Sequence, residues 1–214
     1  MDDGSATIPA PQAAPSAGQA GRPQGLVGRF FGAVMVHLNH EMNLFTLEHL
    51  DVRPGERLLE IGFGPGRLIA ALSERARDGV VCGADHSDTM VRQAVVRNRE
   101  AVRSGRVALF LAKVSRLPFE ARCFDRVCAV NSFQFWPAPE EDLREVRRVL
   151  KPGGLLALTL RHGAGRCPLG MGHLAEPSRV DEALRALAAA DFRDRRVESR
   201  RLRYVTASCV LARG

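Results

Sequence analysis

The feature that most constrains the fold is a set of three glycines, Gly62, Gly64 and Gly66, that directly follows an apolar run. The run over residues 57–61 is short and continuous, which is typical of a strand buried on both faces of a sheet. From residue 67 onward the apolar side chains fall at helical spacing, so the glycines lie on a turn from a strand into a helix. Glycine suits such a turn because it accepts positive φ angles and lets a ligand approach the backbone closely.

The glycine spacing does not match the dinucleotide fingerprint Gly-x-Gly-x-x-Gly, because residue 67 is an arginine where the third glycine would stand. In addition, Glu60 lies two residues before Gly62. A pyrophosphate is negatively charged and binds best at a helix N-terminus that carries no acid. A glutamate at the end of the strand instead favours a cationic ligand or one rich in donors, such as an amino group. The alternative is an ordinary tight strand-to-helix turn.

The bulk properties indicate one globular domain behind a polar tail. The chain has 214 residues, of which 45% are hydrophobic and 26% are charged. Residues 1–25 are rich in Ala, Pro, Gly, Ser and Gln, which predicts a disordered tail before a domain over residues 26–214. No apolar run approaches the roughly 18 residues that span a bilayer, and the N-terminus does not resemble a signal peptide. The five cysteines form no Cys-x-x-Cys pair, so we expect reduced core thiols, a cytoplasmic protein and no metal site.

The remaining pattern alternates strands and helices. Apolar runs at 79–84, 106–112, 124–131 and 155–160 are separated by helical patterns that include 67–77, 89–103 and a helix from Pro139. Such alternation predicts a parallel sheet with helices on both faces, a three-layer α/β/α Rossmann-like sandwich. A glycine-rich loop (163–175), a helix (178–190) and two adjacent strands (193–203 and 205–212) complete a seven-stranded sheet.

Polar side chains stand where two of these strands end. Asp85 follows the strand 79–84 and lies 19 residues after Gly66, close to the ~20-residue spacing at which an acid binds ribose hydroxyls. The alternative is a helix N-cap, although Ser87 or Asp88 can supply that cap. Asn131 ends another strand and is followed by Phe133, Phe135 and Trp136. Open parallel sheets bind ligands at this edge, but we expect at least two of the three aromatic rings to serve as packing.

Glu60 with the three glycines resembles motif I of the class I S-adenosylmethionine-dependent methyltransferases, in particular the type 11 methyltransferase domain and ubiquinone-biosynthesis methyltransferases. The stretch over residues 143–154, Leu-Arg-Glu-Val-Arg-Arg-Val-Leu-Lys-Pro-Gly-Gly, is typical of the same family. The resemblance covers about residues 28–213. It implies a mostly parallel sheet with an antiparallel last strand, methyl transfer from S-adenosylmethionine, and an N-terminal helix (28–50) that caps the cofactor site.

The resemblance also implies the cofactor-binding residues. Glu60 would bind the methionine amino group, the loop residues Gly62, Phe63, Gly64 and Gly66 its methionine half, and Asp85 the ribose. His86, Lys113 and Val114 would lie beside the adenine, with Met90 also flanking it, and Asn131 near the reacting methyl. Lys113 departs from the family pattern, which has an aspartate there that accepts the adenine amino group. Lysine has no acceptor, so backbone groups would have to replace that contact.

The catalytic residues and the acceptor are less constrained. His37, His40 and His162 are candidates for a general base, which is needed only if the acceptor must lose a proton early. The short loop after the fifth strand leaves little room for a lid and favours a small-molecule acceptor. One alternative is a catalytically degenerate methyltransferase-like binding module, for which Lys113 is the support. The other is an RNA methyltransferase, supported by a net charge of +7 and by the arginines within residues 193–203; a solvated strand face is the plainer interpretation of those arginines.

Overall fold

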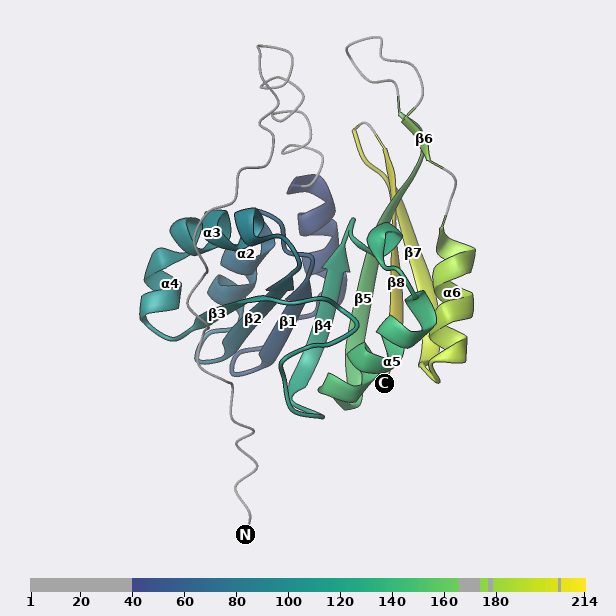
Figure 1. Ribbon diagram of the computed structural model, residues 1–214. Coiled ribbons are helices and arrows are strands. Elements are labelled where there is room, and N and C mark those ends of the chain that lie inside the picture. Colours follow the sequence, from purple (N-terminus) through teal and green to yellow (C-terminus); the bar gives the residue numbers. More distant parts are fainter. Residues whose placement is uncertain (1–39, 166–173, 177–178, 204) are drawn as a thin grey trace.

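The computed structural model describes residues 40–165, 174–176, 179–203 and 205–214, and its arrangement is shown in Figure 1. The predicted tail and the first part of the predicted N-terminal helix lie outside these residues. Within them, the chain forms a single sheet with helices against both faces, as predicted (Figure 1).

The main path of the sheet has the strand order β3-β2-β1-β4-β5-β8-β7. All neighbours pair in parallel except β8, which is antiparallel to both β5 and β7. The predicted Rossmann-like architecture with an antiparallel last strand is therefore confirmed. The strands of this path are β1 (Arg57–Ile61), β2 (Val80–Asp85), β3 (Val107–Leu111), β4 (Phe124–Val130), β5 (Leu150–Gly165), β7 (Arg193–Arg201) and β8 (Thr206–Arg213).

The predicted loop over 163–175 is wrong at both of its ends. The end of β5, residues 163–165, pairs antiparallel with a short extra strand, β6 (Leu174–Glu176), which lies off the main path. Two glycines and one alanine occupy the end of β5, so the sequence there carries none of the β-branched or aromatic residues that signal a strand. The pairing is made by the backbone.

Two apolar layers hold the helices on the sheet. One layer joins β1 and β4 to α5 (Pro139–Val149) and α6 (Val180–Ala189), with Phe124, Leu143 and Leu187 buried in it. The other joins the opposite face to α2 (Arg67–Arg75), α3 (Asp88–Arg97) and the helix over residues 40–50. Burial of one stripe of each helix against a continuous apolar sheet is what the alternating pattern predicts.

The single helix predicted over 89–103 is in fact two, α3 and α4 (Arg99–Arg103), because Asn98 interrupts it. The Asn98 side chain is buried, and its Nδ2 donates to the carbonyl oxygens of Ala94 (2.9 Å) and Gly66 (3.0 Å). Asparagine side chains compete with the backbone for hydrogen bonds in this way.

The helix over residues 40–50 is fixed to the sheet by polar contacts as well as by its apolar face. The Thr46 and Thr159 hydroxyls lie 2.6 Å apart, and Arg126 on β4 donates from Nη1 to the Leu50 carbonyl at 2.6 Å. Arg126 is buried and also pairs through Nε with Glu56 at 2.7 Å. Arg126 lies near the start of β4, whereas Thr159 is paired with Val130 at the end of β4, so these contacts lay the helix along the sheet with Thr46 toward the edge where β4 ends.

The arginine-rich strand β7 is solvated, as the plainer interpretation of its sequence predicted. All nine of its residues are exposed, and it forms one edge of the main sheet path (Figure 1).

Candidate functional site

Two neighbouring cavities lie where β1, β2 and β4 end. The larger, of about 600 Å³, is lined mainly by residues that follow β2, β3 and β4. The smaller, of about 180 Å³, lies between the glycine loop (residues 62–66) and Asn43 of the helix over 40–50. Gly62 and Asn131 line both cavities, so the two are adjacent and a ligand can extend from one into the other.

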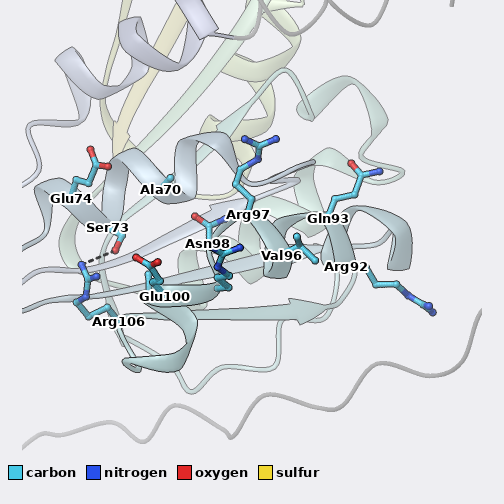
Figure 2. A pocket seen from close by; sticks show the side chains of 12 residues that line it. Ala70, Ser73, Glu74, Arg92, Gln93, Val96, Arg97, Asn98, Glu100 and Arg106 are labelled. Atoms are coloured by element: carbon cyan, nitrogen blue, oxygen red, sulfur yellow. Dashed lines mark hydrogen bonds between the residues drawn. The ribbon is translucent and has the colours of Figure 1, made fainter. Parts of the chain in front are cut away.

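A third hollow, of about 910 Å³, lies on the outer side of α2, α3 and α4 and holds none of the predicted site residues (Figure 2). Two of its residues support the glycine loop from behind. Arg97 donates from Nε to the Pro65 carbonyl at 2.9 Å, and Asn98 donates to the Gly66 carbonyl. Figure 2 shows these two side chains among the polar residues around the hollow.

The three glycines of the loop have different surroundings although all have positive φ angles. A Cβ on Gly62 would lie 2.5 Å from the Ser132 Cβ, and one on Gly66 would lie 2.7 Å from the Ala94 Cβ. A Cβ on Gly64 would meet nothing within 4 Å. Gly62 and Gly66 are thus required by packing, whereas Gly64 leaves an open face beside the smaller cavity.

Glu60, at the end of β1, lines the smaller cavity and is 3% exposed. Its Oε2 atom is buried without a hydrogen-bond partner. Burial, and secondly the charge of Asp85, raise the pKa of Glu60 well above its usual value, against the Ile69 backbone N–H, which lowers it. A buried carboxyl with an unused oxygen favours a ligand that brings a positive charge and a donor.

Asp85, at the end of β2, lines the larger cavity and is buried. Its Oδ2 accepts the Gly64 backbone N–H at 2.9 Å, and its Oδ1 accepts the Ser87 backbone N–H at 2.8 Å. Asp85 therefore orders the glycine loop in addition to facing the cavity. Each oxygen keeps a second lone pair for a ligand hydroxyl, and Ser87 supplies the N-cap of α3, as expected.

The residues predicted beside the adenine all line the larger cavity, with Met90 among them. His86 and Lys113 are exposed at its rim, while Val114 is buried. The His86 Nδ1 atom lies 3.8 Å from the Asp85 Oδ1 atom. The interior of the cavity thus combines the apolar Val114 with the acid Asp85, and the Lys113 side chain stands at its mouth.

Asn131 and the aromatic residues after it form the wall next to β4. Asn131 has a φ of 51°, and its backbone N–H donates to the Thr159 carbonyl at 2.8 Å. Gln134 donates from Nε2 to the Asn131 carbonyl at 3.0 Å and to its Oδ1 atom at 3.1 Å. Trp136 is buried and Phe135 is 72% exposed, and both line the larger cavity.

Two of the three rings in this segment are packing residues, as expected. Phe133 is 1% exposed, and its ring contacts that of Trp136 at a centroid distance of 5.3 Å. Phe135 is the exception, because it lines the larger cavity with most of its surface exposed.

Of the histidines proposed as bases, the two within the described residues, His40 and His162, do not line either cavity. His37 lies outside the described residues. His40 is exposed, and His162 on β5 has its Nε2 atom 2.7 Å from the Ser208 hydroxyl. In the part of the chain that the structure describes, no three His, Cys, Asp or Glu side chains are grouped to hold a metal ion.

Asn43 and Arg67 are cavity residues that the sequence analysis did not assign. In the sequence, Arg67 was interpreted only as the residue that replaces the third glycine of the dinucleotide fingerprint. Its position directly after Gly66 nevertheless places it at the glycine loop. Asn43 belongs to the polar face of the predicted N-terminal helix, where periodicity alone does not separate a solvated residue from one over a cavity.

This combination of a parallel sheet, a glycine loop after β1 and an acid after β2 defines a nucleoside-binding enzyme of Rossmann-like fold. The methyltransferase domain family matches residues 59–158 of the chain. The uncharacterized methyltransferase YdaC of Bacillus subtilis (strain 168) is 31% identical over 130 residues, 61% of this chain and 70% of that protein.

Other similar proteins match over a smaller share of their own length. The ubiquinone/menaquinone biosynthesis C-methyltransferase UbiE of Bordetella avium (strain 197N) is 36% identical over 122 residues, 56% of this chain and 46% of that protein. Among solved structures, the [4+2]-cyclase SpnF has a TM-score of 0.64 at 23% identity and covers 82% of this chain and 80% of its own. The chain thus spans about half the length of UbiE.

The chain belongs to the methyltransferase domain family. The predicted resemblance to S-adenosylmethionine-dependent methyltransferases is confirmed. None of the helices in the described ranges is both long and apolar enough to cross a membrane.

Proposed function

We propose that this protein transfers a methyl group from S-adenosylmethionine to a small-molecule acceptor at the edge formed by β1, β2 and β4. The observation that carries this proposal is the pair of adjacent cavities, each with a buried carboxylate. A ligand that carries a cation at one end and a ribose at the other would use both acids. S-adenosylmethionine has this combination of groups.

The residues present fit the cofactor. Glu60 offers an unpartnered buried oxygen for the methionine ammonium, and the open face of Gly64 admits the methionine chain. Asp85 is the residue for the ribose hydroxyls. The larger cavity provides apolar walls for the adenine, and the absence of an acceptor on the Lys113 side chain leaves the adenine amino group to backbone carbonyls.

When bound, the cofactor would supply an electrophilic methyl on its sulfonium, which would pass to the acceptor nucleophile as the carbon–sulfur bond breaks and S-adenosylhomocysteine leaves as a neutral thioether. The contribution of the chain is to align the methyl group of the cofactor with the acceptor nucleophile and to exclude water from the site. Asn131 is positioned for this because it lines both cavities. The exposed ring of Phe135 at the mouth offers an apolar surface to the acceptor and a favourable environment for the cation.

A small acceptor is supported by relatives such as UbiE, which is named for ubiquinone/menaquinone biosynthesis. A cytoplasmic location is supported by four cysteines in the described residues that are buried and free. SpnF, a neighbour in fold, is a [4+2]-cyclase, so the fold by itself does not define the reaction. The test must therefore follow the methyl group.

The experiment is incubation of the protein with methyl-labelled S-adenosylmethionine and either a small-molecule extract or total RNA, together with calorimetric titration of the cofactor. Label in the small-molecule fraction supports the proposal. Label in RNA would instead favour the alternative function, an RNA methyltransferase. Binding without label transfer would favour the degenerate binding module. No binding would refute the cofactor site altogether.

A further inference from the structure

Two side chains of opposite charge line the smaller cavity, Glu60 from the end of β1 and Arg67 from the first turn of α2. Asn43 adds a third polar group from the helix over residues 40–50. The cavity has a volume of about 180 Å³, which suits the head of an amino acid and is too small for a nucleoside. The larger cavity next to it provides the space for the nucleoside.

Both charged side chains have an atom without a partner. Arg67 Nε is shielded from solvent and has no hydrogen bond, and the same is true of Glu60 Oε2. Within the described residues neither side chain forms an ion pair, so no direct ion pair satisfies either group. Buried polar atoms of native proteins are usually hydrogen-bonded, and exceptions call for an explanation.

The start of α2 adds a second feature that favours an anion. Gly66 is the N-cap of α2 and supplies no side-chain hydrogen bond, and the first turn contains no acidic residue. A helix N-terminus of this kind carries partial positive charge and free backbone N–H groups. Arg67 is the first residue of this helix, so its guanidinium and the helix N-terminus act on the same region.

We propose that Arg67 binds the α-carboxylate of S-adenosylmethionine, so that Glu60 and Arg67 together recognise the amino-acid end of the cofactor as a zwitterion. This inference rests on the proposed function and deepens it. An α-amino acid carries its ammonium and its carboxylate on one carbon, and a cavity lined by a carboxyl group and a guanidinium group, each with an unpartnered atom, matches that pair. Guanidinium binds carboxylate through charge-assisted, often bidentate, hydrogen bonds.

The test compares two ligands that differ by one group, S-adenosylmethionine and its decarboxylated form, which keeps the ammonium, the sulfonium and the nucleoside. Calorimetric titration is carried out with the unaltered protein, with Arg67→Ala and Arg67→Gln, and with Arg75→Ala. Arg75 is an exposed arginine in the last turn of the same helix and serves as the matched control. Thermal unfolding of each variant verifies that it is folded.

We expect the unaltered protein and Arg75→Ala to bind S-adenosylmethionine at least about tenfold more tightly than the decarboxylated ligand. In Arg67→Ala and Arg67→Gln this preference should disappear, because affinity for S-adenosylmethionine falls while affinity for the decarboxylated ligand stays within about twofold. A preference that persists in both Arg67 variants overturns the inference, as does equal affinity of the unaltered protein for the two ligands. If the unaltered protein binds neither ligand, the proposed function itself fails, which is a distinguishable result.

Discussion

Glu60 is a buried acid whose ionisation lowers the stability of the fold, and the proposed role in cofactor binding accounts for its presence. Burial and the neighbouring Asp85 raise its pKa well above the usual value of 4.5. When the pKa of a carboxyl is higher in the folded chain than in the unfolded chain, its contribution to stability is fully present at a pH below the unfolded-state pKa. That contribution is lost as the pH rises toward the folded-state pKa. Glu60→Gln cannot ionise, so it should be more stable than the unaltered protein at neutral pH, where the unfolded chain carries an ionised carboxylate that the fold disfavours. It should also bind S-adenosylmethionine more weakly.

Urea unfolding of the Glu60→Gln variant and the unaltered protein at several pH values measures the first effect, and calorimetry measures the second. The stability difference should shrink as pH falls below 4.5, where the unfolded chain also carries a neutral carboxyl. A stability difference that does not depend on pH would contradict the assignment of a desolvated carboxyl. Unchanged cofactor affinity would contradict its role in binding.

Alanine substitutions at Gly62 and Gly64 should have different effects on the free energy of unfolding and on cofactor affinity. In Gly62→Ala the new Cβ would lie 2.5 Å from the Ser132 Cβ, so the loop or Ser132 must move, and we expect a loss of about 2 kcal/mol or more. In Gly64→Ala the Cβ enters open space, and only the positive φ angle is penalised, at about 1 kcal/mol. The Gly64 variant should nevertheless lose cofactor affinity because its methyl group faces the cavity side. Equal unfolding free energies for the two variants, from denaturant titration, would contradict this difference.

At the scale of elements, the break between α3 and α4 holds the glycine loop in place. Asn98 donates to the Gly66 carbonyl from behind the loop, beside Arg97 (Figure 2). Asn98→Ala leaves the Gly66 carbonyl without this donor, so we expect a loss of about 1–2 kcal/mol in stability and weaker binding of S-adenosylmethionine. Gln93→Ala is the matched control, because Gln93 lines the same outer hollow and is exposed. If Asn98→Ala binds S-adenosylmethionine with the same affinity as Gln93→Ala, the hydrogen bond from Asn98 to the loop does not contribute to cofactor binding.

The elements that could be predicted are those with a strong apolar pattern. The strands β1, β2, β4 and the middle of β5 are rich in apolar residues, and α5 and α6 carry clear buried stripes. The break at Asn98 was missed because the helical pattern does not show that the Asn98 side chain donates to Ala94 and to Gly66, the latter 32 residues away in the chain. The pairing of residues 163–165 with β6 was missed because glycine and alanine give no strand signal.

At the scale of the whole molecule, the acids and glycines of the site could be predicted because each stands at the end of a strand that the sequence marks clearly. Arg67 and Asn43 could not, because their roles depend on a cavity that exists only after α2 and the helix over 40–50 are packed together. The histidines show the converse. The position of His162 in the sequence suggested a place at the edge of the sheet where ligands bind, but its side chain forms a hydrogen bond with Ser208. Reactive residue types alone therefore did not locate a catalytic base.

The distribution of positive charge separates the small-molecule and RNA interpretations. The net charge is +7, and exposed arginines are concentrated on β7, which forms an edge of the main sheet path far from β1 and β2 in the strand order. We expect the triple variant Arg193→Gln, Arg196→Gln and Arg201→Gln to keep its cofactor affinity and methyl transfer, and to change stability by no more than about 0.5 kcal/mol per site.

Any RNA binding by the unaltered protein should be weak, with a Kd on the order of 10⁻⁴–10⁻⁶ M, and should fall steeply with salt, as nonspecific contacts with a polyanion do. The same measurement on the triple glutamine variant should show a lower affinity and a smaller salt slope, whereas a matched triple lysine variant keeps the charge and the slope. Loss of methyl transfer together with RNA binding in the glutamine variant alone would show that β7 contributes to the reaction. In that case the acceptor would be a nucleic acid that reaches from the edge strand to the cavity at β4, and the small-molecule proposal would be wrong.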